Sequence, residues 1–482
     1  MSSSLRNIFF TLLLYAIHNT IYAQGSQAVS DNIFSTRDSA VIKDTNRQFV
    51  IRNIFIEGND RTRISTITRE LSFHEKEAYP LNVIIEKFYE SRKQLMNTGL
   101  FTNVVVSLKS LQGYDVYVKI EVEEKWYVYP LPFLRAVDKS FHQWWTEKNR
   151  SFDRVNYGIK ITDYNFTGRN DKLDVKLMGG FTRQIAIDYY NLFLDRGLKW
   201  SASAGFDLGQ NREINYITLD NKQVSFRNQD HYLNSYINSF MQLSWRPAIK
   251  TKHSFRVGYS YNDIADTISK LNPHFSNNKN IIRYLDLSYT LSYRDVDYIY
   301  YPTSGYMGDL KLMRQGFNDP VNLWQITAKG SASWPVGTNY FFNLAAAGVL
   351  KLPFRQPYIT KQLIGYDDLF LQGYEYYVID GVAGGYTKAT ISRPVWQTHI
   401  SLPSKKIKEL NYIPLKLYAK TFINMGYVYN PEAGPNLLNN RMLYSAGIGL
   451  DIVASTDFVI KIEWSFNQLG QNGVYLHRIN YF

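Results

Sequence analysis

The feature that most constrains this chain is a long tract in which apolar and polar residues alternate one by one. The alternation is clearest in five segments: "KWSASAGFDLG" (Lys199–Gly209), "SFRVGYSYN" (Ser254–Asn262), "LDLSYTLSYR" (Leu285–Arg294), "AGIGLDIV" (Ala446–Val453) and "FVIKIEWSF" (Phe458–Phe466). A period of two residues is that of a β-strand with one apolar face. Helix signals almost vanish beyond Trp126, so the tract predicts an all-β domain of many strands.

The aromatic content indicates which surroundings this sheet faces. The chain has 38 Tyr, 28 Phe and 9 Trp residues, and many of them lie on the apolar faces of the alternating segments. Aromatic side chains form girdles at the two lipid interfaces of membrane barrels. The mean hydropathy is −0.30, and beyond the N-terminus no run reaches the roughly 18 apolar residues that a membrane helix needs.

A transmembrane barrel accounts for the length of the tract. In lipid every backbone group must be paired, so strands can span a membrane only as a closed barrel. At about 20 residues for each strand with its connection, the roughly 330 residues give about 16 antiparallel strands. A soluble β-sandwich also alternates, but a tract of this length without a domain break favours the barrel.

The N-terminus predicts a secretory signal peptide over residues 1–23. Arg6 supplies a basic start, "IFFTLLLYAI" (Ile8–Ile17) is an apolar core of suitable length, and Ala23 precedes the expected cleavage site. Residues 24–46 are polar and are expected to be a disordered linker. The chain has no cysteine, which excludes disulfides, thiolate metal sites and a lipid anchor on cysteine.

Residues 47–126 predict a compact α+β domain that precedes the barrel. The expected order is strand, helix, helix, strand, strand. The corresponding segments are "FVIRNIFIEG" (Phe49–Gly58), "TRISTITREL" (Thr62–Leu71), "NVIIEKFYESRKQLMNTG" (Asn82–Gly99), "FTNVVVSL" (Phe101–Leu108) and "YDVYVKIEVEE" (Tyr114–Glu124). Gly58 and Asn59 form a turn signal after the first strand, and Gly99 suits the left-handed end of the second helix.

Two segments of this domain resemble a POTRA domain, the periplasmic module of BamA-type outer-membrane proteins. They are "IEGNDRTR" (Ile56–Arg63), which contains the Gly58–Asn59 turn, and "LMNTGLFTNVVV" (Leu95–Val106), which contains Gly99 and Phe101. The resemblance implies that this domain receives client chains by strand addition at a sheet edge. The alternative is a generic α+β domain that serves as a spacer.

The rest of the chain resembles a BamA/TamA-type barrel. The matching segments are "RDVDYIYYPTSGY" (Arg294–Tyr306), "LQGYEYYVIDG" (Leu371–Gly381), "FINMGYVYN" (Phe422–Asn430) and a closing strand that ends at Phe482. The resemblance implies a connector over residues 127–154 and a transmembrane barrel over residues 155–482. It places the protein in the outer membrane of a Gram-negative (diderm) bacterium, with the POTRA domain in the periplasm.

The resemblance also implies that a loop near residues 365–390 is folded into the barrel lumen. The family motif is Arg-Gly-Phe/Tyr, and here it is Gln372, Gly373 and Tyr374. The family's partner on the wall is an aspartate in a Phe-x-Asp-x-Gly pattern, where this chain has Asn424 followed by Gly426. We therefore expect Gln372 and Asn424 to face each other as neutral amides, worth about 1 kcal/mol and weaker than a charged pair.

The two ends of the barrel predict a seam between its first and last strands. "VNYGIKITDYNFTGRND" (Val155–Asp171), with Tyr157, matches the opening strand and turn of the family. In "GVYLHRINYF" (Gly473–Phe482) the alternation breaks. The seam and C-terminal signal residues are expected to be Tyr157, Val474, Leu476 and Phe482, with Arg478 and Asn480 sharing their face. An ordinary strand with Arg478 near a lipid interface is the alternative.

Composition and motifs exclude several classes of function. The formal charge of +12 is dispersed and no recognition helix is apparent, so we predict no binding of nucleic acid. The histidines form no HExxH or similar metal-ligand pair. No Gly-x-Ser-x-Gly nucleophile motif occurs. The segment "GVAGGY" (Gly381–Tyr386) lacks the Gly-Lys-Ser/Thr ending of a phosphate-binding loop. We expect Asp286, Asp451 and Glu463 to line a hydrated lumen. We predict no enzyme, no cofactor and no metal.

The predicted function is that of an outer-membrane protein insertase or translocase acting through a barrel seam or lumen. The expected partners are outer-membrane lipids and unfolded client proteins, with periplasmic or lipoprotein accessory subunits as further candidates. The alternatives are a passive porin and a non-enzymatic structural subunit of an outer-membrane complex. The identity of the clients, and the choice between insertion, export and scaffolding, stay open at the level of sequence.

Overall fold

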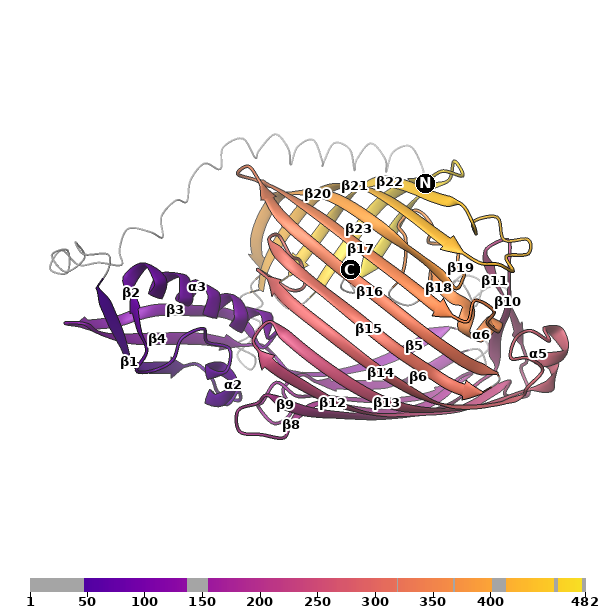
Figure 1. The fold of residues 1–482 in the computed structure, drawn as a ribbon, viewed down its shortest axis with the longest axis horizontal. Coiled ribbons are helices and arrows are strands. Elements are labelled where there is room, and N and C mark those ends of the chain that lie inside the picture. Colours follow the sequence, from indigo (N-terminus) through magenta and orange to yellow (C-terminus); the bar gives the residue numbers. More distant parts are fainter. Residues whose placement is uncertain are drawn as a thin grey trace.

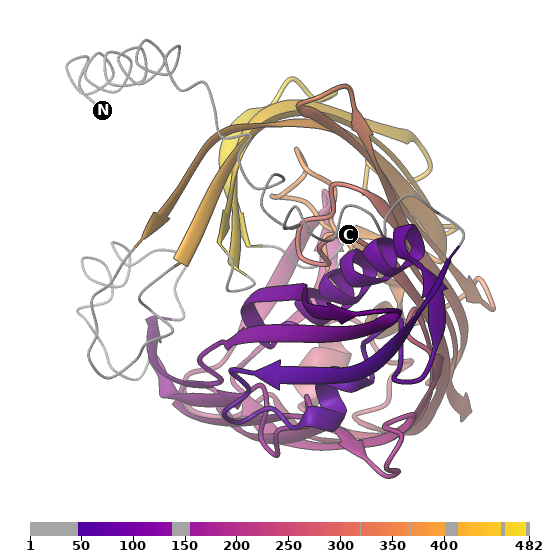
Figure 2. The same ribbon diagram turned by 90° about the vertical axis from the view of Figure 1, so that its left-hand side faces the viewer.

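The computed structural model describes residues 47–136, 155–318, 320–366, 369–400, 413–454 and 458–478. A small α+β domain lies at one end of a large barrel of antiparallel strands (Figure 1). Seen from that end, the small domain lies across the mouth of the ring of strands (Figure 2). The predicted signal peptide, the linker 24–46 and Phe482 lie outside the described residues.

The small domain contains two helices and a four-stranded sheet. Its elements are β1 (Gln48–Glu57), α2 (Ile64–Thr68), β2 (Ala78–Pro80), α3 (Leu81–Asn97), β3 (Phe101–Gln112) and β4 (Asp115–Glu124). The sheet order is β2-β1-β4-β3, with β1 parallel to β4. The strand β2 was not foreseen, because three residues are too few for a visible alternation.

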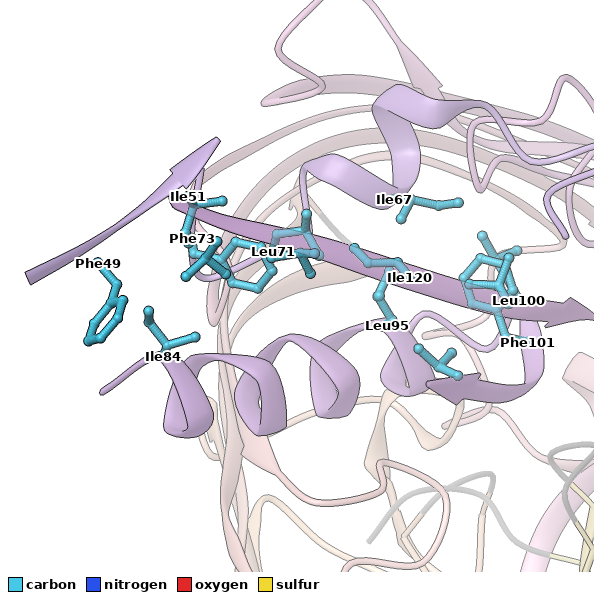
Figure 3. Close-up of a cluster of buried hydrophobic side chains, with 14 of the residues drawn as sticks. Phe49, Ile51, Ile67, Leu71, Phe73, Ile84, Leu95, Leu100, Phe101 and Ile120 are labelled. Carbon is cyan, nitrogen blue, oxygen red and sulfur yellow. The ribbon is translucent and has the colours of Figure 1, made fainter. Parts of the chain in front are cut away.

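One apolar cluster holds this domain together (Figure 3). Ile84 and Leu95 of α3 and Ile120 of β4 are at most 2% exposed, since helix and strand each contribute one apolar face. The predicted turn is tight: Gly58 has a φ of +86°, and a Cβ there would lie 2.0 Å from the carbonyl oxygen of Val122.

The large sheet contains sixteen strands within the described residues, and every neighbouring pair is antiparallel. In chain order they are β5 (Val128–Ala136), β6 (Val155–Asp163), β7 (Lys172–Gly180), β8 (Arg183–Phe193), β9 (Trp200–Asn211), β12 (Asn234–Ala248), β13 (Thr251–Ile264), β14 (Ile281–Val296), β15 (Gly305–Asn318), β16 (Val321–Val336), β17 (Tyr340–Leu352), β20 (Ala383–Ile400), β21 (Ile413–Tyr429), β22 (Met442–Ala454), β23 (Phe458–Asn467) and β24 (Asn472–Arg478). The predicted fold class, an α+β domain followed by a barrel of about 16 antiparallel strands, is confirmed.

The alternation of the sequence becomes an alternation of faces. In β23 the side chains of Ile462, Trp464 and Phe466 are exposed, whereas Glu463 and Ser465 are fully buried. Successive side chains of a strand point to opposite faces, so the apolar set faces outward and the polar set inward. An outward apolar band with aromatic residues is what a lipid-facing barrel requires.

The start of the barrel corrects the sequence prediction. Residues 127–154 were expected to be a connector, but Val128–Ala136 form β5 and pair with β6 over their whole length. The opening strand is therefore β5 and not Val155–Asp163. The prediction was wrong because Pro130 and Pro132 interrupt the strand signal, and proline in a run normally argues against a strand.

The elements between strands gather at the barrel end that is farther from the small domain (Figure 1). They are a hairpin of β10 (Glu213–Leu219) and β11 (Lys222–Arg227), the short helices α5 (Asp266–Leu271) and α6 (Tyr358–Lys361), and the small pair β18 (Gln362–Ile364) and β19 (Ile379–Asp380). Among the described helices, none has the length and apolar character needed to cross a membrane.

Candidate functional site

The connection between β17 and β20 folds back against the inner wall of the barrel. It spans residues 353–382 and includes α6, β18 and β19. Leu371, Gln372 and Tyr374 are almost completely buried, and they contact the strands β21, β23 and β22 respectively. We call residues 369–378 the inner loop. It was expected near 365–390, but from Ala383 onward the chain forms β20, a strand of the wall.

Gly373 fixes how closely the inner loop approaches the wall. Its φ is +89°, and a Cβ on it would lie 2.8 Å from Cβ of Ser445, so only glycine fits without a shift. The carbonyl oxygen of Gly373 accepts a hydrogen bond of 2.7 Å from Nδ2 of Asn467. Next to it, the hydroxyl of Tyr374 donates to the carbonyl oxygen of Tyr444 at 3.0 Å.

Gln372 has a different partner from the one that we expected. Its Nε2 donates to Oε1 of Glu463 on β23 at 2.8 Å, whereas Nδ2 of Asn424 donates to Oγ of Ser445 at 3.1 Å. The two amides share no hydrogen bond in the described part of the chain, so the hydrogen bond expected between Gln372 and Asn424 is not formed. In the register of the wall, Ser445 lies directly across from Asn424 and accepts the hydrogen bond of its Nδ2.

The other expected wall residue, Gly426, does contact the inner loop. A Cβ on Gly426 would lie 3.1 Å from Cδ2 of Leu371. The absence of a side chain at Gly426 therefore makes room for an apolar residue of the loop. The loop and the strand β21 thus meet through packing at Gly426 and not through a polar pair at Asn424.

Three buried charged residues lie beneath the inner loop, one on each of three adjacent strands. Nζ of Lys420 on β21 lies 2.6 Å from Oδ1 of Asp451 on β22, and it also contacts Oε1 of Glu463 on β23. The three side chains are at most 2% exposed. We call Lys420, Asp451 and Glu463 the wall triad. Each of its charges has an opposite partner, which such burial requires.

Because of the wall triad, the inner loop still binds a charged group, although Gln372 and Asn424 are both neutral. Gln372 is neutral, as the sequence has it, but it donates to a carboxylate that is paired with Lys420. A hydrogen bond to an ionised group is stronger than one between neutral amides. The positive charge is therefore supplied by the wall and not by the loop.

Contacts from both ends of the barrel converge on the wall triad. The inner loop enters from one end, and there Nε2 of His477 on β24 lies 3.3 Å from Oε1 of Glu375 in the loop. The same nitrogen lies 3.4 Å from Oε2 of Glu463. From the other end, the hydroxyl of Tyr301, in the turn between β14 and β15, donates to Oδ2 of Asp451 at 3.0 Å. The inner loop is thereby tied to the last strand of the sheet as well as to the wall.

Of the expected seam residues, the structure places some on an end strand of the sheet and one on an inner strand. Val474 and Leu476 lie on β24, an end strand of the sheet, and are 72% and 70% exposed on the outward face. Tyr157 lies on β6, which pairs with β5 on one side and β7 on the other. Tyr157 is therefore not at the seam, because β5 precedes it. Phe482 lies outside the described residues.

The small domain is held to the barrel by buried ion pairs. Arg246 of β12 donates to both carboxylate oxygens of Glu70, at 2.6 and 2.8 Å, and Arg69 also pairs with Glu70. Burial alone would raise the pKa of Glu70, but the guanidiniums of Arg246 and Arg69 outweigh it and lower the pKa. A fully buried carboxylate with two cationic partners fixes the domain at the mouth of the barrel.

The predicted turn of the small domain contributes to this contact. Nδ2 of Asn59 donates to the carbonyl oxygen of Thr62 at 3.0 Å, and this orders the segment that follows Gly58. Arg61 in that segment pairs with Asp163 of β6 at 2.7 Å. On the other side of the domain, Gly99 ends α3 with a φ of +75°, and Phe101 enters the core.

Sequence reasoning did not identify Lys420 and His477 as site residues. Asp451 and Glu463 were expected only to line the lumen. The sequence does carry one signal for Lys420, because it stands four residues before Asn424 and therefore on the same inward face of β21. The pairing itself depends on which residues of three strands lie side by side. Alternation alone does not give that register.

Two family models match this chain. The model described as the Omp85 superfamily domain matches residues 165–456. The POTRA model, described as a surface antigen variable number repeat, matches residues 49–125.

A curated relative and two solved structures are also similar. The outer membrane protein assembly factor BamA of Neorickettsia risticii (strain Illinois) is 29% identical over 79 residues, which is 16% of this chain and only 10% of that relative. CdiB from Escherichia coli has a TM-score of 0.51 and 13% identity over 89% of this chain and 74% of its own. The BamA structure from Haemophilus ducreyi lacking POTRA domains 1–3 has a TM-score of 0.45 and 15% identity, over 90% of this chain and 84% of its own. At these identities the match to CdiB shows a shared fold.

Proposed function

The chain belongs to the Omp85 superfamily, and from this membership we propose that it inserts client proteins into the outer membrane or exports them across it. It is an outer-membrane barrel with a periplasmic POTRA domain. One observation supports the proposal most directly: the sheet has two end strands, β5 and β24, and within the described residues no pairing joins them.

The proposed mechanism uses this seam. An end strand in a membrane carries backbone donors and acceptors that water does not satisfy. Such an edge is a template for an additional strand. A client strand that pairs at the seam would enter the bilayer with its backbone groups satisfied, and the same opening would let it leave sideways into lipid.

The POTRA domain supplies a second edge on the periplasmic side. Its sheet ends at β3, a strand of twelve residues that pairs only with β4 among the described strands. An edge strand of this length suits the addition of an extended client segment, although the carbonyl oxygen of Val104 already accepts from Nε of Arg92 at 2.9 Å. We propose that clients reach the barrel from this edge. Periplasmic or lipoprotein accessory subunits remain proposed partners, and catalysis is not part of the proposal.

Depletion of the protein tests the proposed function. We expect a specific set of outer-membrane or surface proteins to disappear from the cell envelope before growth stops, as measured by quantitative proteomics of outer-membrane fractions. The control is depletion complemented by a plasmid copy. A large, stable and ungated conductance in planar bilayers, together with an unchanged envelope proteome, would instead support a passive porin.

The lumen contacts argue for the insertase or translocase over the porin. The inner loop reaches Glu463 from one end of the barrel, and Tyr301 reaches Asp451 from the other. The two segments meet at the wall triad and leave a cavity of about 110 Å³, lined by Tyr301, Gln372 and His477 among others. The inner loop and the turn between β14 and β15 thus occupy part of the lumen at this wall, which favours the insertase or translocase over a plain pore.

A further inference from the structure

A cavity with a strongly basic lining lies between the POTRA domain and the inner wall of the barrel. Its volume is about 370 Å³, and it lies where the segment after α2 meets the strands β8, β9, β12, β13 and β14. The described residues that line it include one acidic residue, Glu70, and six basic residues, Arg69, Lys199, Arg246, Lys250, Lys252 and Arg294. A cavity with this excess of positive charge attracts anions.

Two of these cations are balanced by carboxylates just outside the lining. Arg294 of β14 donates to both carboxylate oxygens of Asp309, at 2.8 and 2.7 Å. Nζ of Lys250 lies 3.1 Å from Oε1 of Glu90 and 2.9 Å from Oδ2 of Asp295. The charge that is available to an anion therefore comes from other residues of the lining.

Arg69 and Arg246 share one carboxylate, that of Glu70. Two guanidiniums and one carboxylate leave this group with one net positive charge. Nη1 of Arg69 is buried and has no hydrogen-bond partner among the described residues, while the guanidinium itself lies over the ring of Phe193. A buried N–H without an acceptor is costly, so Arg69 retains a donor that an anion in the cavity would satisfy.

Lys252 is a second source of uncompensated charge. It stands on β13, and its Nζ donates to the neutral amide oxygen of Asn191 on β8 at 3.2 Å. The charged groups that act most strongly on Lys252 are Arg69, Arg246 and Arg294, and all three carry the same sign as the lysine. An anion beside Lys252 would relieve this repulsion.

Serine hydroxyls add neutral donors to the same wall. Ser201 of β9 and Ser244 of β12 lie directly across from each other and are 5% and 2% exposed. Ser292 of β14 lies directly across from Lys252, and all three serines line the cavity. Arginine, lysine and hydroxyl groups together match the several oxygens of a phosphate group.

We propose that this cavity binds one phosphate group between Arg69 of the POTRA domain and Lys252 of the barrel. A phosphate monoester carries about 1.5–2 negative charges near neutral pH. The group of Arg69, Glu70 and Arg246 and the ammonium of Lys252 each contribute one uncompensated positive charge, so the charges match. The two cations belong to different domains, and bound phosphate therefore joins the POTRA domain to the barrel. The site does not depend on the proposed function.

The surroundings of the cavity indicate a phosphate from the aqueous side and not one from a lipid headgroup. On the outer face of the wall, Trp200 and Trp245 stack with their ring centroids 5.9 Å apart, and Trp245 and His253 stack at 5.2 Å. Ser201 and Lys252 are sequence neighbours of these residues and point to the opposite face. The wall thus separates the cavity from lipid. The ligand is inorganic phosphate or a soluble phosphate monoester that enters from the periplasm.

Equilibrium dialysis of the full chain against radiolabelled inorganic phosphate tests the proposal. The protein is kept in dodecyl maltoside micelles, and sodium chloride holds the ionic strength constant. We expect saturable binding of one phosphate per chain, weakened at least tenfold by Lys252→Met and less than threefold by Lys252→Arg, which keeps the charge. The absence of saturable binding to the unsubstituted protein overturns the inference.

Lys311→Met is the matched control for Lys252→Met. Lys311 is also a partly buried lysine of the barrel wall, and it points inward because Leu310 and Leu312 are exposed on the outer face of β15. It is not among the residues that line the cavity, so its phosphate affinity should stay within twofold of the unsubstituted protein. Equal losses in the two variants overturn the inference. Heat-dependent gel mobility shows whether each variant has folded, and Lys252→Gln replaces a Lys252→Met that has not.

Arg69→Gln tests the contribution of the POTRA domain. It removes the donor without a partner, and we expect phosphate to bind at least fivefold more weakly. Arg246 still pairs with Glu70 in this variant, and energy transfer between dyes on α3 and on the turn after β12 checks that the domain stays docked. Unchanged phosphate affinity in a docked Arg69→Gln overturns the inference. If the domain undocks, the Lys252 variants decide.

The same dialysis in lipid nanodiscs separates the two sources of a phosphate group. We expect the affinity for inorganic phosphate to agree within twofold between nanodiscs of phosphatidylcholine and of phosphatidylglycerol. Loss of binding in phosphatidylglycerol alone would show that a lipid headgroup occupies the cavity and would overturn the assignment to a soluble ligand. If phosphate binds as expected but depletion leaves the envelope proteome unchanged, the proposed function fails while the phosphate site stands.

Discussion

Nζ of Lys420 lies 2.6 Å from Oδ1 of Asp451, and both side chains are 2% exposed inside the barrel. Glu463 also contacts this ammonium group and accepts a hydrogen bond from Gln372 of the inner loop. Lys420 therefore contacts two carboxylates, and one of these carboxylates holds the loop.

Lys420→Met is expected to destabilise the barrel and to release the inner loop. The substitution removes the ammonium group that contacts both Asp451 and Glu463, and breaking a buried pair in this way costs about 3–5 kcal/mol. Thermal unfolding, followed by the loss of heat-dependent gel mobility, measures the effect. Lys270→Met, at an exposed position of α5, is the control and should leave the unfolding temperature unchanged. Similar unfolding temperatures for the two variants would contradict a structural role for the triad.

Moving the positive charge from the wall to the loop provides the second prediction. Gln372→Arg alone adds a further cation near Lys420 and is expected to destabilise the protein. Combined with Lys420→Met, the arginine is expected to restore part of the lost stability, because it can pair with Glu463 from the loop side. Residues of one network couple by about 0.5–3 kcal/mol. A double-mutant cycle on thermal unfolding measures this coupling, and strictly additive effects would rule out the charge exchange.

Gly373→Ala is expected to displace the inner loop. The added Cβ would lie 2.8 Å from Cβ of Ser445, at a φ of +89°. Limited proteolysis of the folded protein in micelles should cut the loop faster in this variant. Gly470→Ala is the control, since Gly470 also has a positive φ of +74° but has no atom within 4 Å of a new Cβ. If both variants are cut at the same rate, backbone strain and not contact with Ser445 explains the effect.

The sequence predicted the strands and the faces of the barrel better than the contacts between them. Alternation places Trp464 outward and Glu463 inward whatever the neighbouring strands are. It says nothing about which residues of β21 and β22 lie beside Glu463, because register depends on the turns and on the whole sheet. That is why Glu463 was expected to line the lumen, whereas its contact with Lys420 was not foreseen.

The same limit explains two of the wrong assignments. The strand β5 was missed because Pro130 and Pro132 weaken the local strand signal. An edge strand nevertheless tolerates prolines whose nitrogens face away from its neighbour. The partner of Gln372 was misassigned because a motif match identifies Asn424 but not the hydrogen bond from Asn424 to Ser445. Both errors concern pairing between distant segments, which local pattern does not determine.

The contact between Glu70 and Arg246 predicts that docking of the POTRA domain depends on pH. The pKa of Glu70 is lowered in the docked state, so the docking energy is fully present above the ordinary glutamate pKa of about 4.3. It is lost as the pH falls through the lowered pKa, because the carboxylate must then be protonated. Energy transfer between dyes on α3 and on the turn after β12 should fall in that acidic range.

Glu70→Gln should show reduced transfer already at pH 7 and little further change on acidification. Glu86→Gln, at an exposed position of α3, should behave as the unsubstituted protein does. Retention of full transfer in Glu70→Gln would mean that the ion pair does not hold the domain.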